Sequence, residues 1–211
     1  VFKAAFTKKN IKIVGINDLT DTKTLAHLLK HDTAYRTSEL EISYDEKNII
    51  VKGKKIPVFA EKDPSLLPWG KLKVDVVMEC TGRFTDVKAG AKKVVISAPA
   101  KGTDVPTYVR AVNCGKVEKE KSCVINNASC TTNCIAPVMA VLEEKFGIAK
   151  AMLNTIHAYT ADQNLQDGPH KDLRRGRAAA ENIVPTSTGA AKAVGEVMES
   201  VVGKFDGLAI R

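Results

Sequence analysis

Apolar residues along the chain fall into short runs separated by polar segments, and the runs show two different periods. Valine- and isoleucine-rich runs, typical of buried strands, occur at residues 11–16, 40–44, 48–51, 56–59, 74–80 and 93–97. Helical composition at residues 1–7 and helical spacing of Leu25, Leu28 and Leu29 predict two helices, the second capped by Asp21 or Thr22. The alternation through Asn127 predicts a doubly wound α/β domain, in which ligands bind beyond the carboxyl ends of the strands.

A second region is predicted to open with a long helix near Thr131. Its apolar positions share one helical face and comprise Ile135, Val138, Met139, Leu142 and Phe146. A strand is expected within residues 149–160, a long polar loop at 161–177, a helix at 189–202 and a strand at 208–210. Loops of that length are usually functional or disordered.

Composition narrows the class of protein. With 44% hydrophobic and 27% charged residues, the 211-residue chain is neither disordered nor collagen-like. No apolar run reaches the roughly 18 to 20 residues that a bilayer span requires, and the first residues lack the layout of a signal peptide. We therefore expect a soluble, unsecreted protein of the cytoplasm without a membrane partner.

The charge and the cysteines point to partners and compartment. A net charge of +8 favours anionic partners such as sugar phosphates, nucleotides or nucleic acid. Only 5% of the residues are aromatic, which argues against a base-stacking platform for single-stranded nucleic acid. The five cysteines include no C-x-x-C pair, which argues against a disulfide framework and a structural zinc site and suits a reducing cytosol.

Asp18 closes the apolar run 11–17, where a dinucleotide-binding fold places a carboxylate to accept hydrogen bonds from the adenosine ribose. A carboxylate there repels a 2′-phosphate and so favours NAD over NADP. The supporting G-x-G-x-x-G pattern is absent from the sequence. The alternative is an ordinary N-cap or turn aspartate.

The densest chemistry lies in residues 126–134, just ahead of the predicted long helix. Cys130 is placed at or near the helix N-terminus, where free N–H groups and the helix dipole favour the nucleophilic thiolate form. Ser129 and Thr131 add hydroxyl groups suited to a phosphate oxygen. The alternative is a buried structural cysteine beside capping residues, and Cys134, one turn further on, is predicted to be such a cysteine.

His157 lies near the end of the next predicted strand, where it would serve a thiol nucleophile as base. The alternative is a histidine satisfied within the core.

Two other groups carry ambiguous chemistry. His27 and His31 are interpreted as surface residues, and the basic loop that holds Lys171, Arg174, Arg175 and Arg177 either binds phosphate or is a solvated face.

Three segments together resemble the phosphorylating glyceraldehyde-3-phosphate dehydrogenase family: residues 128–134 (ASCTTNC), 157–160 (HAYT) and 185–193 (PTSTGAAKA). Shorter matches occur in the same order at 14–18, 63–65, 81–84 and 97–100. The resemblance implies a Rossmann-type NAD-binding domain at residues 1–128 and an α+β catalytic domain at residues 129–211. It also implies NAD, glyceraldehyde 3-phosphate and inorganic phosphate as cofactor and substrates, and a homotetramer. With the low aromatic content, we expect no nucleic acid among its partners.

The same resemblance assigns roles to individual residues. Cys130 is implied as the nucleophile and His157 as the base. The implied phosphate-binding positions are Ser129, Thr131, Thr160, Arg175, Thr188, Gly189 and Arg211. Asp18, Lys62 and Ser97 are implied to lie along the cofactor, with Lys62 standing where many relatives carry arginine, whose planar fork lysine lacks.

The sequence departs from the family pattern by lacking segments. The first strand with its Gly-rich loop, about half of the catalytic domain and a helix near residues 86–88 have no counterpart, so we expect both domains to be incomplete and the sequence to be part of a longer chain. Two alternatives remain: the related erythrose-4-phosphate dehydrogenases, which release their acyl product to water, and a basic RNA-binding protein.

Overall fold

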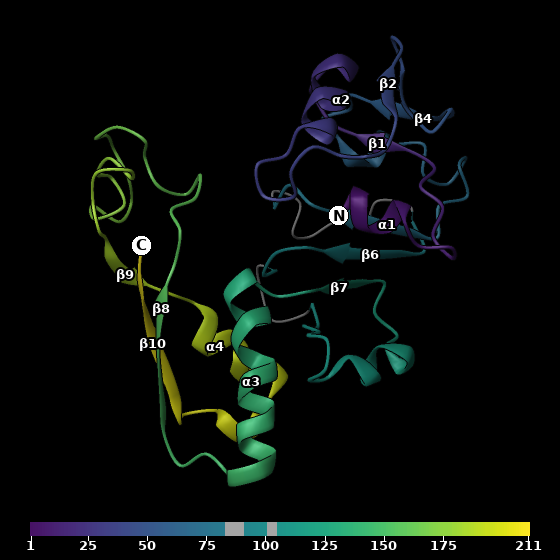
Figure 1. Cartoon of the computed structure of the whole chain (residues 1–211). Helices are drawn as coiled ribbons and strands as arrows, with labels where there is room; N and C mark the ends of the chain where they lie inside the picture. Colours follow the sequence, from purple (N-terminus) through teal and green to yellow (C-terminus); the bar gives the residue numbers. More distant parts are fainter. Residues whose placement is uncertain (83–90, 101–104) are drawn as a thin grey trace. The chain divides into compact units, whose positions relative to one another are not determined.

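The chain forms two compact units in the computed structural model, which describes residues 1–82, 91–100 and 105–211 (Figure 1). The first unit contains residues 1–77 and 91–92, and the second contains residues 78–82, 93–100 and 105–211. The break expected near Asp86, Val87 and Lys88 lies outside the described residues. Parallel strand pairs occur in both units, so the α/β class predicted from the sequence is confirmed.

The first unit is built around a four-stranded sheet of order β1-β4-β3-β2. Its elements are α1 (Phe2–Phe6), β1 (Ile16–Asn17), α2 (Thr22–Lys30), β2 (Ile42–Tyr44), β3 (Asn48–Val51), β4 (Lys54–Phe59) and the 3₁₀ helix η1 (Pro64–Leu66). β1 runs parallel to β4, whereas β2, β3 and β4 form antiparallel pairs. Ile49, Val51 and Ile56 form the buried centre of its core.

Two details of this unit differ from the sequence prediction. Only Ile16 and Asn17 of the apolar run 11–17 pair with a neighbouring strand, so β1 is shorter than expected. Asp21 caps α2 by accepting from the Thr24 amide, as predicted, and Leu25 and Leu29 pack on the core. Leu28, assigned to the same apolar face, is 58% exposed, because Ala26 takes the buried position on this helix.

Among its described residues, the second unit holds two three-stranded sheets, of order β5-β6-β7 and β8-β10-β9. Its elements are β6 (Lys93–Ile96), η2 (Cys114–Lys119), β7 (Val124–Asn126), α3 (Cys130–Phe146), β8 (Ala151–Ile156), β9 (Pro185–Ser187), α4 (Ala190–Val197), η3 (Glu199–Val201) and β10 (Phe205–Ile210), and β5 (Val76–Glu79) spans the division between the units. β10 runs parallel to β8 along its full length, and the pair is visible beside α3 and α4 in Figure 1.

The core of the second unit lies where α3 packs against α4. Ala136 and Met139 of α3 and Val194 and Val197 of α4 are buried there. The predicted apolar face of α3 is therefore partly wrong. Val138, Leu142 and Phe146 are 50%, 41% and 81% exposed, because the row that meets the core instead begins at Thr132 and continues through Ala136 and Met139.

The remaining predicted elements were found with shifted ends. The strands predicted at 149–160 and 208–210 are β8 and β10, and the loop at 161–177 contains no helix or strand. The helix predicted at 189–202 ends at Val197 and is followed by η3. Among the helices of the described residues, none has the length and apolarity needed to cross a membrane.

Candidate active site

Cys130 is the first residue of α3, and its exposed side chain projects from the start of that helix. Ser129 is the N-cap: its backbone is extended, and its hydroxyl oxygen accepts a hydrogen bond of 3.1 Å from the Thr132 amide. The first-turn amides of a helix have no acceptor within it and carry partial positive charge, which stabilises an anion next to them. A thiolate at Cys130 therefore lies in a favourable electrostatic position.

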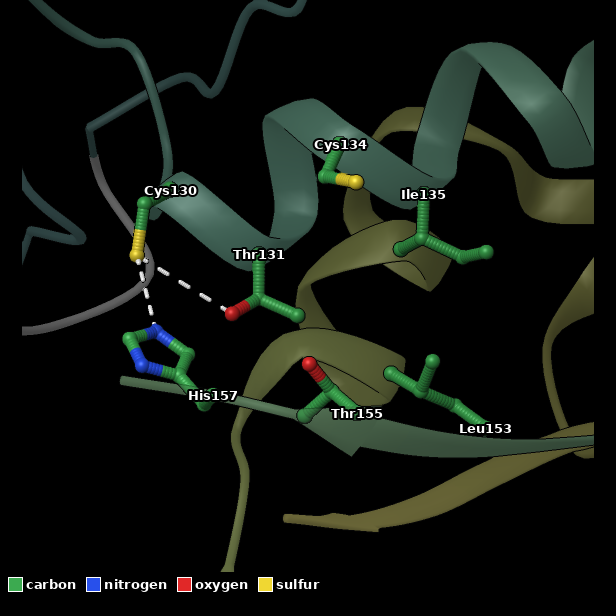
Figure 2. Close-up of a pocket in the computed structure, with 7 residues that line it drawn as sticks. All are labelled: Cys130, Thr131, Cys134, Ile135, Leu153, Thr155 and His157. Carbon is green, nitrogen blue, oxygen red and sulfur yellow. Dashed lines mark hydrogen bonds between the residues drawn. The ribbon is translucent and has the colours of Figure 1, made fainter. Parts of the chain in front are cut away.

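His157 supplies the second chemical group, one residue beyond the end of β8. Its Nε2 lies 3.6 Å from the sulfur of Cys130, and its Nδ1 lies 2.6 Å from the carbonyl oxygen of Ala158. A carbonyl oxygen only accepts hydrogen bonds, so Nδ1 carries the proton in the neutral ring and Nε2 presents a lone pair to the sulfur. Figure 2 shows the imidazole and the thiol pointing toward each other.

The backbone holds this histidine in place. Its amide donates to the Ile210 carbonyl of β10 with a length of 2.8 Å, which continues the parallel β8–β10 pairing past the last strand residue. Arg211 follows Ile210 and exchanges backbone hydrogen bonds in both directions with Val184. His157 and Arg211 therefore emerge from the carboxyl ends of two neighbouring parallel strands, which is the usual location of ligand sites in α/β folds.

A pocket of about 230 Å³ lies between the first two turns of helix α3 and the strand β8. It is lined by Cys130, Thr131, Cys134, Ile135, Leu153, Thr155 and His157, all drawn in Figure 2. Pockets for drug-sized ligands occupy roughly 300–1,000 Å³, so this volume suits a small metabolite. The prediction that Cys134 is buried was wrong: its side chain is exposed and lines this pocket.

Arg211 and Thr160, both expected at a phosphate position, are brought together by the structure. Nη2 of Arg211 donates to the hydroxyl oxygen of Thr160 at 2.7 Å, and Nε donates to Oε1 of Gln163 at 2.8 Å. Gln163 is only 4% exposed, and its Nε2 is buried without a partner among the described residues. The guanidinium is thereby fixed in orientation beside a threonine hydroxyl, an arrangement suited to binding a phosphate oxygen.

Arg175 has a different environment. Its guanidinium forms an ion pair with Asp162, donates from Nε to the Thr186 hydroxyl at 3.1 Å and donates from Nη2 to the Ser187 carbonyl at 2.9 Å. These contacts hold residues 161–177 against β9. Arg175 is not among the residues that line the Cys130 pocket.

Aspartates accompany the arginines of this basic loop. Arg174 pairs with Asp172, and Arg177 pairs with Asp167. Hydrogen bonds from Arg174 and then from the Thr186 hydroxyl hold the pKa of Asp172 well below its usual range. The loop is therefore an internally paired structure.

The other expected phosphate ligands occupy helix starts. Ser129 caps α3, Thr131 lies with its hydroxyl oxygen 3.9 Å from the Cys130 sulfur, and Gly189 is the N-cap of α4. The Thr188 hydroxyl accepts from the Ala190 amide at 3.2 Å. Of these four residues, Thr131 alone lines the Cys130 pocket.

Two of the expected cofactor-binding residues, Asp18 and Lys62, belong to the first unit. Asp18 directly follows β1, its carboxylate is exposed, and Oδ1 accepts from the Thr20 amide at 2.9 Å. Asn17 exchanges two side-chain hydrogen bonds with the Glu61 backbone, which fixes the segment that carries exposed Lys62. An oriented carboxylate and a cation beyond parallel strands β1 and β4 fit the ribose and phosphate groups of a dinucleotide.

Ser97, the third expected cofactor residue, lies in the second unit. It directly follows β6, is exposed, and donates its amide to the Glu79 carbonyl at 2.9 Å. Asn127 follows the parallel neighbour β7 and donates its amide to the Ile96 carbonyl. Ser97 and the turn that leads to Cys130 therefore share one edge of this sheet.

Two side chains that orient the site arginines, Asp162 and Gln163, were not predicted from the sequence. Asp162 and Gln163 lie just after the HAYT segment, but their positions in the sequence do not show that they contact Arg175 and Arg211. The aspartates interspersed among the loop arginines were the one sequence feature that indicated ion pairing within this loop. Within the described ranges, the structure contains no group of three or more His, Cys, Asp or Glu side chains arranged to hold a metal ion.

Comparison with known proteins matches the beginning and the end of the sequence to domains of one family. Residues 1–87 match the family model described as glyceraldehyde 3-phosphate dehydrogenase, NAD binding domain, and residues 129–211 match the one described as glyceraldehyde 3-phosphate dehydrogenase, C-terminal domain. A glyceraldehyde-3-phosphate dehydrogenase of Geobacillus stearothermophilus is 53% identical over all of this chain and 65% of its own length. One from Streptomyces coelicolor is 54% identical over 96% of this chain and 62% of its own. The chain thus spans slightly less than two thirds of these relatives.

Proposed function

The chain belongs to the glyceraldehyde-3-phosphate dehydrogenase family, and we propose that it carries the nucleophile and the base of the phosphorylating oxidation of glyceraldehyde 3-phosphate. The overall reaction takes glyceraldehyde 3-phosphate, NAD⁺ and inorganic phosphate to 1,3-bisphosphoglycerate and NADH. The observation that carries the proposal is the 3.6 Å separation between the Cys130 sulfur and Nε2 of His157 at the start of α3.

In the first step the Cys130 thiolate adds to the aldehyde carbon of the substrate and forms a C–S bond. The carbonyl π electrons move to oxygen, and the resulting oxyanion takes the Nε2 proton that His157 received from the Cys130 thiol, which gives a hemithioacetal and a neutral imidazole. Free amides of the first turn of α3 and the imidazolium form of His157 are positioned to stabilise that oxyanion. Addition to sulfur thus makes the carbonyl carbon ready for oxidation.

In the second step His157 acts as general base. Nε2 accepts the hydroxyl proton of the hemithioacetal while the C–H electron pair departs as hydride, which leaves a thioester on Cys130. Bound NAD⁺ supplies the hydride acceptor for this oxidation. The bond between Nδ1 and the Ala158 carbonyl keeps Nε2 directed toward the sulfur throughout.

In the third step inorganic phosphate attacks the thioester carbon and the Cys130 thiolate leaves, which yields 1,3-bisphosphoglycerate. We assign the phosphate groups to Arg211 and Thr160, which are already joined in the structure, with Ser129, Thr131, Arg175, Thr188 and Gly189 completing the two anion positions. Charge-assisted hydrogen bonds from arginine are about twice as strong as neutral ones, which suits the retention of a doubly charged substrate.

The cofactor is assigned to Asp18, Lys62 and Ser97. The Asp18 carboxylate would accept hydrogen bonds from the adenosine ribose hydroxyls, and its charge disfavours the 2′-phosphate of NADP. Lys62 would pair with an anionic group as a point charge. The exposed side chains of all three residues follow strand ends, which supports the assignment.

We further assign residues 1–128 to the dinucleotide-binding domain and residues 129–211 to the catalytic domain. The protein is proposed to act in the cytoplasm as a homotetramer, without nucleic acid as a partner. The five free cysteines, all exposed in the described residues, suit a reducing compartment.

Product analysis with the full chain tests the proposed reaction. With glyceraldehyde 3-phosphate and NAD⁺, sustained NADH formation should require inorganic phosphate and should yield 1,3-bisphosphoglycerate, and Cys130→Ser should abolish it. Preferential turnover of erythrose 4-phosphate with release of the free acid would instead assign the chain to the hydrolytic branch of the family. Equal turnover by the Cys130→Ser variant would disprove the role of the thiol.

A further inference from the structure

Ala128 precedes the catalytic segment in a backbone conformation that alanine rarely adopts. Its φ is 56°, in the left-handed region, and its side chain is 3% exposed. A residue with a Cβ is disfavoured there and stays only when its surroundings hold it. Ser129 and Cys130 follow directly, so this turn sets the direction in which α3 begins.

The buried side chain of Asn126 holds the turn. It is 3% exposed, and its Oδ1 accepts a hydrogen bond of 3.0 Å from the Ala128 amide. Its Nδ2 donates to the Val105 carbonyl at 3.0 Å and to the Thr107 hydroxyl oxygen at 2.9 Å. One amide therefore connects the left-handed residue to the neighbouring chain segment 105–107.

The network continues to another helix. The Thr107 hydroxyl donates to Oε2 of Glu196 at 2.9 Å, and Glu196 lies on α4, which packs against α3. The backbone of Asn126 also donates to the Pro106 carbonyl and accepts from the Tyr108 amide. The amide and the carbonyl of Asn126 are thus both held by hydrogen bonds to the backbone. Its side chain is therefore fixed where it accepts from the Ala128 amide.

We propose that Asn126 is a positioning residue that holds Ala128 in the left-handed conformation and so fixes the Cys130 sulfur opposite His157. This role rests on the function proposed for Cys130. Asn126 does not reach the pocket that the cysteine lines, so it acts only through the turn. Neither Asn126 nor Ala128 has a role in the three steps of the proposed reaction.

Asn127 provides a matched control. It is also an asparagine after β7, and its Nδ2 donates to the Tyr108 carbonyl at 2.7 Å, so it too connects to the segment that follows residue 105. Its side chain is exposed, and among the described residues the Ala128 amide donates to Asn126 and not to Asn127. Asn127→Ala therefore removes a similar hydrogen bond without releasing the left-handed turn.

The experiment measures alkylation rates by iodoacetamide at Cys130 and Cys134 in the full chain, by mass spectrometry of the peptides. Both thiols are exposed on α3, so Cys134 reports the folding of the helix. Asn126→Ala should slow alkylation of Cys130 about fivefold, the effect expected for loss of the one buried hydrogen bond that reaches the Ala128 amide, and leave Cys134 unchanged. Asn127→Ala should leave both rates unchanged.

A rescue variant separates positioning from general stability. Glycine adopts positive φ as readily as negative φ, so Ala128→Gly added to Asn126→Ala should restore the Cys130 rate. The proposal is overturned if Asn126→Ala and Asn127→Ala give the same Cys130 rate, if both cysteines slow together, or if Ala128→Gly restores nothing. In the unaltered chain Cys130 should be alkylated faster than Cys134. Equal rates there would overturn this proposal and the proposed function together, whereas the other outcomes concern Asn126 alone.

Discussion

The sulfur of Cys130 and Nε2 of His157 lie 3.6 Å apart, although the two residues are 27 positions apart in the chain. The start of α3 presents the thiol, and the end of β8 presents the imidazole. Because Nδ1 is committed to the Ala158 carbonyl, the ring has one orientation toward the sulfur. The pair thus combines a nucleophile and a proton acceptor in contact, which is the minimum for covalent aldehyde chemistry.

Replacement of the base tests this pairing. His157→Asn should lower kcat for NADH formation by about 10²- to 10⁴-fold, because asparagine accepts no proton from the hemithioacetal. His27→Asn on the exposed face of α2 serves as control and should have the activity of the unaltered protein. An unchanged kcat for His157→Asn would show that the ring is not the base.

The phosphate position is tested at Arg211. Arg211→Lys keeps the charge but loses the fork that contacts Thr160 and Gln163, so KM for glyceraldehyde 3-phosphate should rise about 10- to 100-fold, with kcat less affected. Arg177→Lys, at an exposed arginine paired with Asp167, is the matched control. Equal KM values for both variants would remove Arg211 from the phosphate site.

Cofactor choice is tested at Asp18. Asp18→Ser removes the carboxylate that would repel a 2′-phosphate, so the ratio of kcat/KM for NAD⁺ over that for NADP⁺ should fall at least about tenfold. Asp75→Ser, at an exposed carboxylate paired with Lys92, should leave the ratio unchanged. The same ratio in both variants would show that Asp18 does not contact the adenosine ribose.

Asp172 predicts a pH-dependent stability. Hydrogen bonds from Arg174 and Thr186 lower its pKa in the folded chain. A lowered folded-state pKa contributes stability above the unfolded value of about 4, and this contribution is lost as pH falls through the folded-state pKa. Asp172→Asn should therefore lower the urea midpoint at about pH 7 and approach the unaltered protein in strong acid. A difference between the two proteins that stayed constant with pH would contradict this linkage.

Much of the fold could be predicted from local sequence because short-range signals agree with it. Asp21 caps α2, Ser129 caps α3, and the valine-rich runs form β5 and β6. β9 was missed because it is three residues long and begins with Pro185, so it exists only through pairing with β10. β1 is shorter than predicted for a related reason. A strand requires a paired neighbour as well as apolar residues, and only Ile16 and Asn17 pair with β4.

The candidate site shows the same division between local and long-range information. The position of Cys130 at a helix start was accessible from the sequence, because capping residues precede an apolar helix. The partners of Arg211 and Arg175 were not accessible, because Gln163 and Asp162 meet them through folding of the loop at 161–177. The exposure of Cys134 depended on which row of α3 meets α4, and apolar spacing indicated the neighbouring row.

In the proposed reaction Cys130 carries the acyl group during oxidation. Mass spectrometry of the full chain after reaction with glyceraldehyde 3-phosphate and NAD⁺, with phosphate omitted, detects this covalent intermediate. A 3-phosphoglyceroyl thioester should be found on the peptide that contains Cys130, and addition of inorganic phosphate should remove it. Formation of NADH without an adduct on that peptide, or with the adduct on a different cysteine, would show that Cys130 is not the nucleophile.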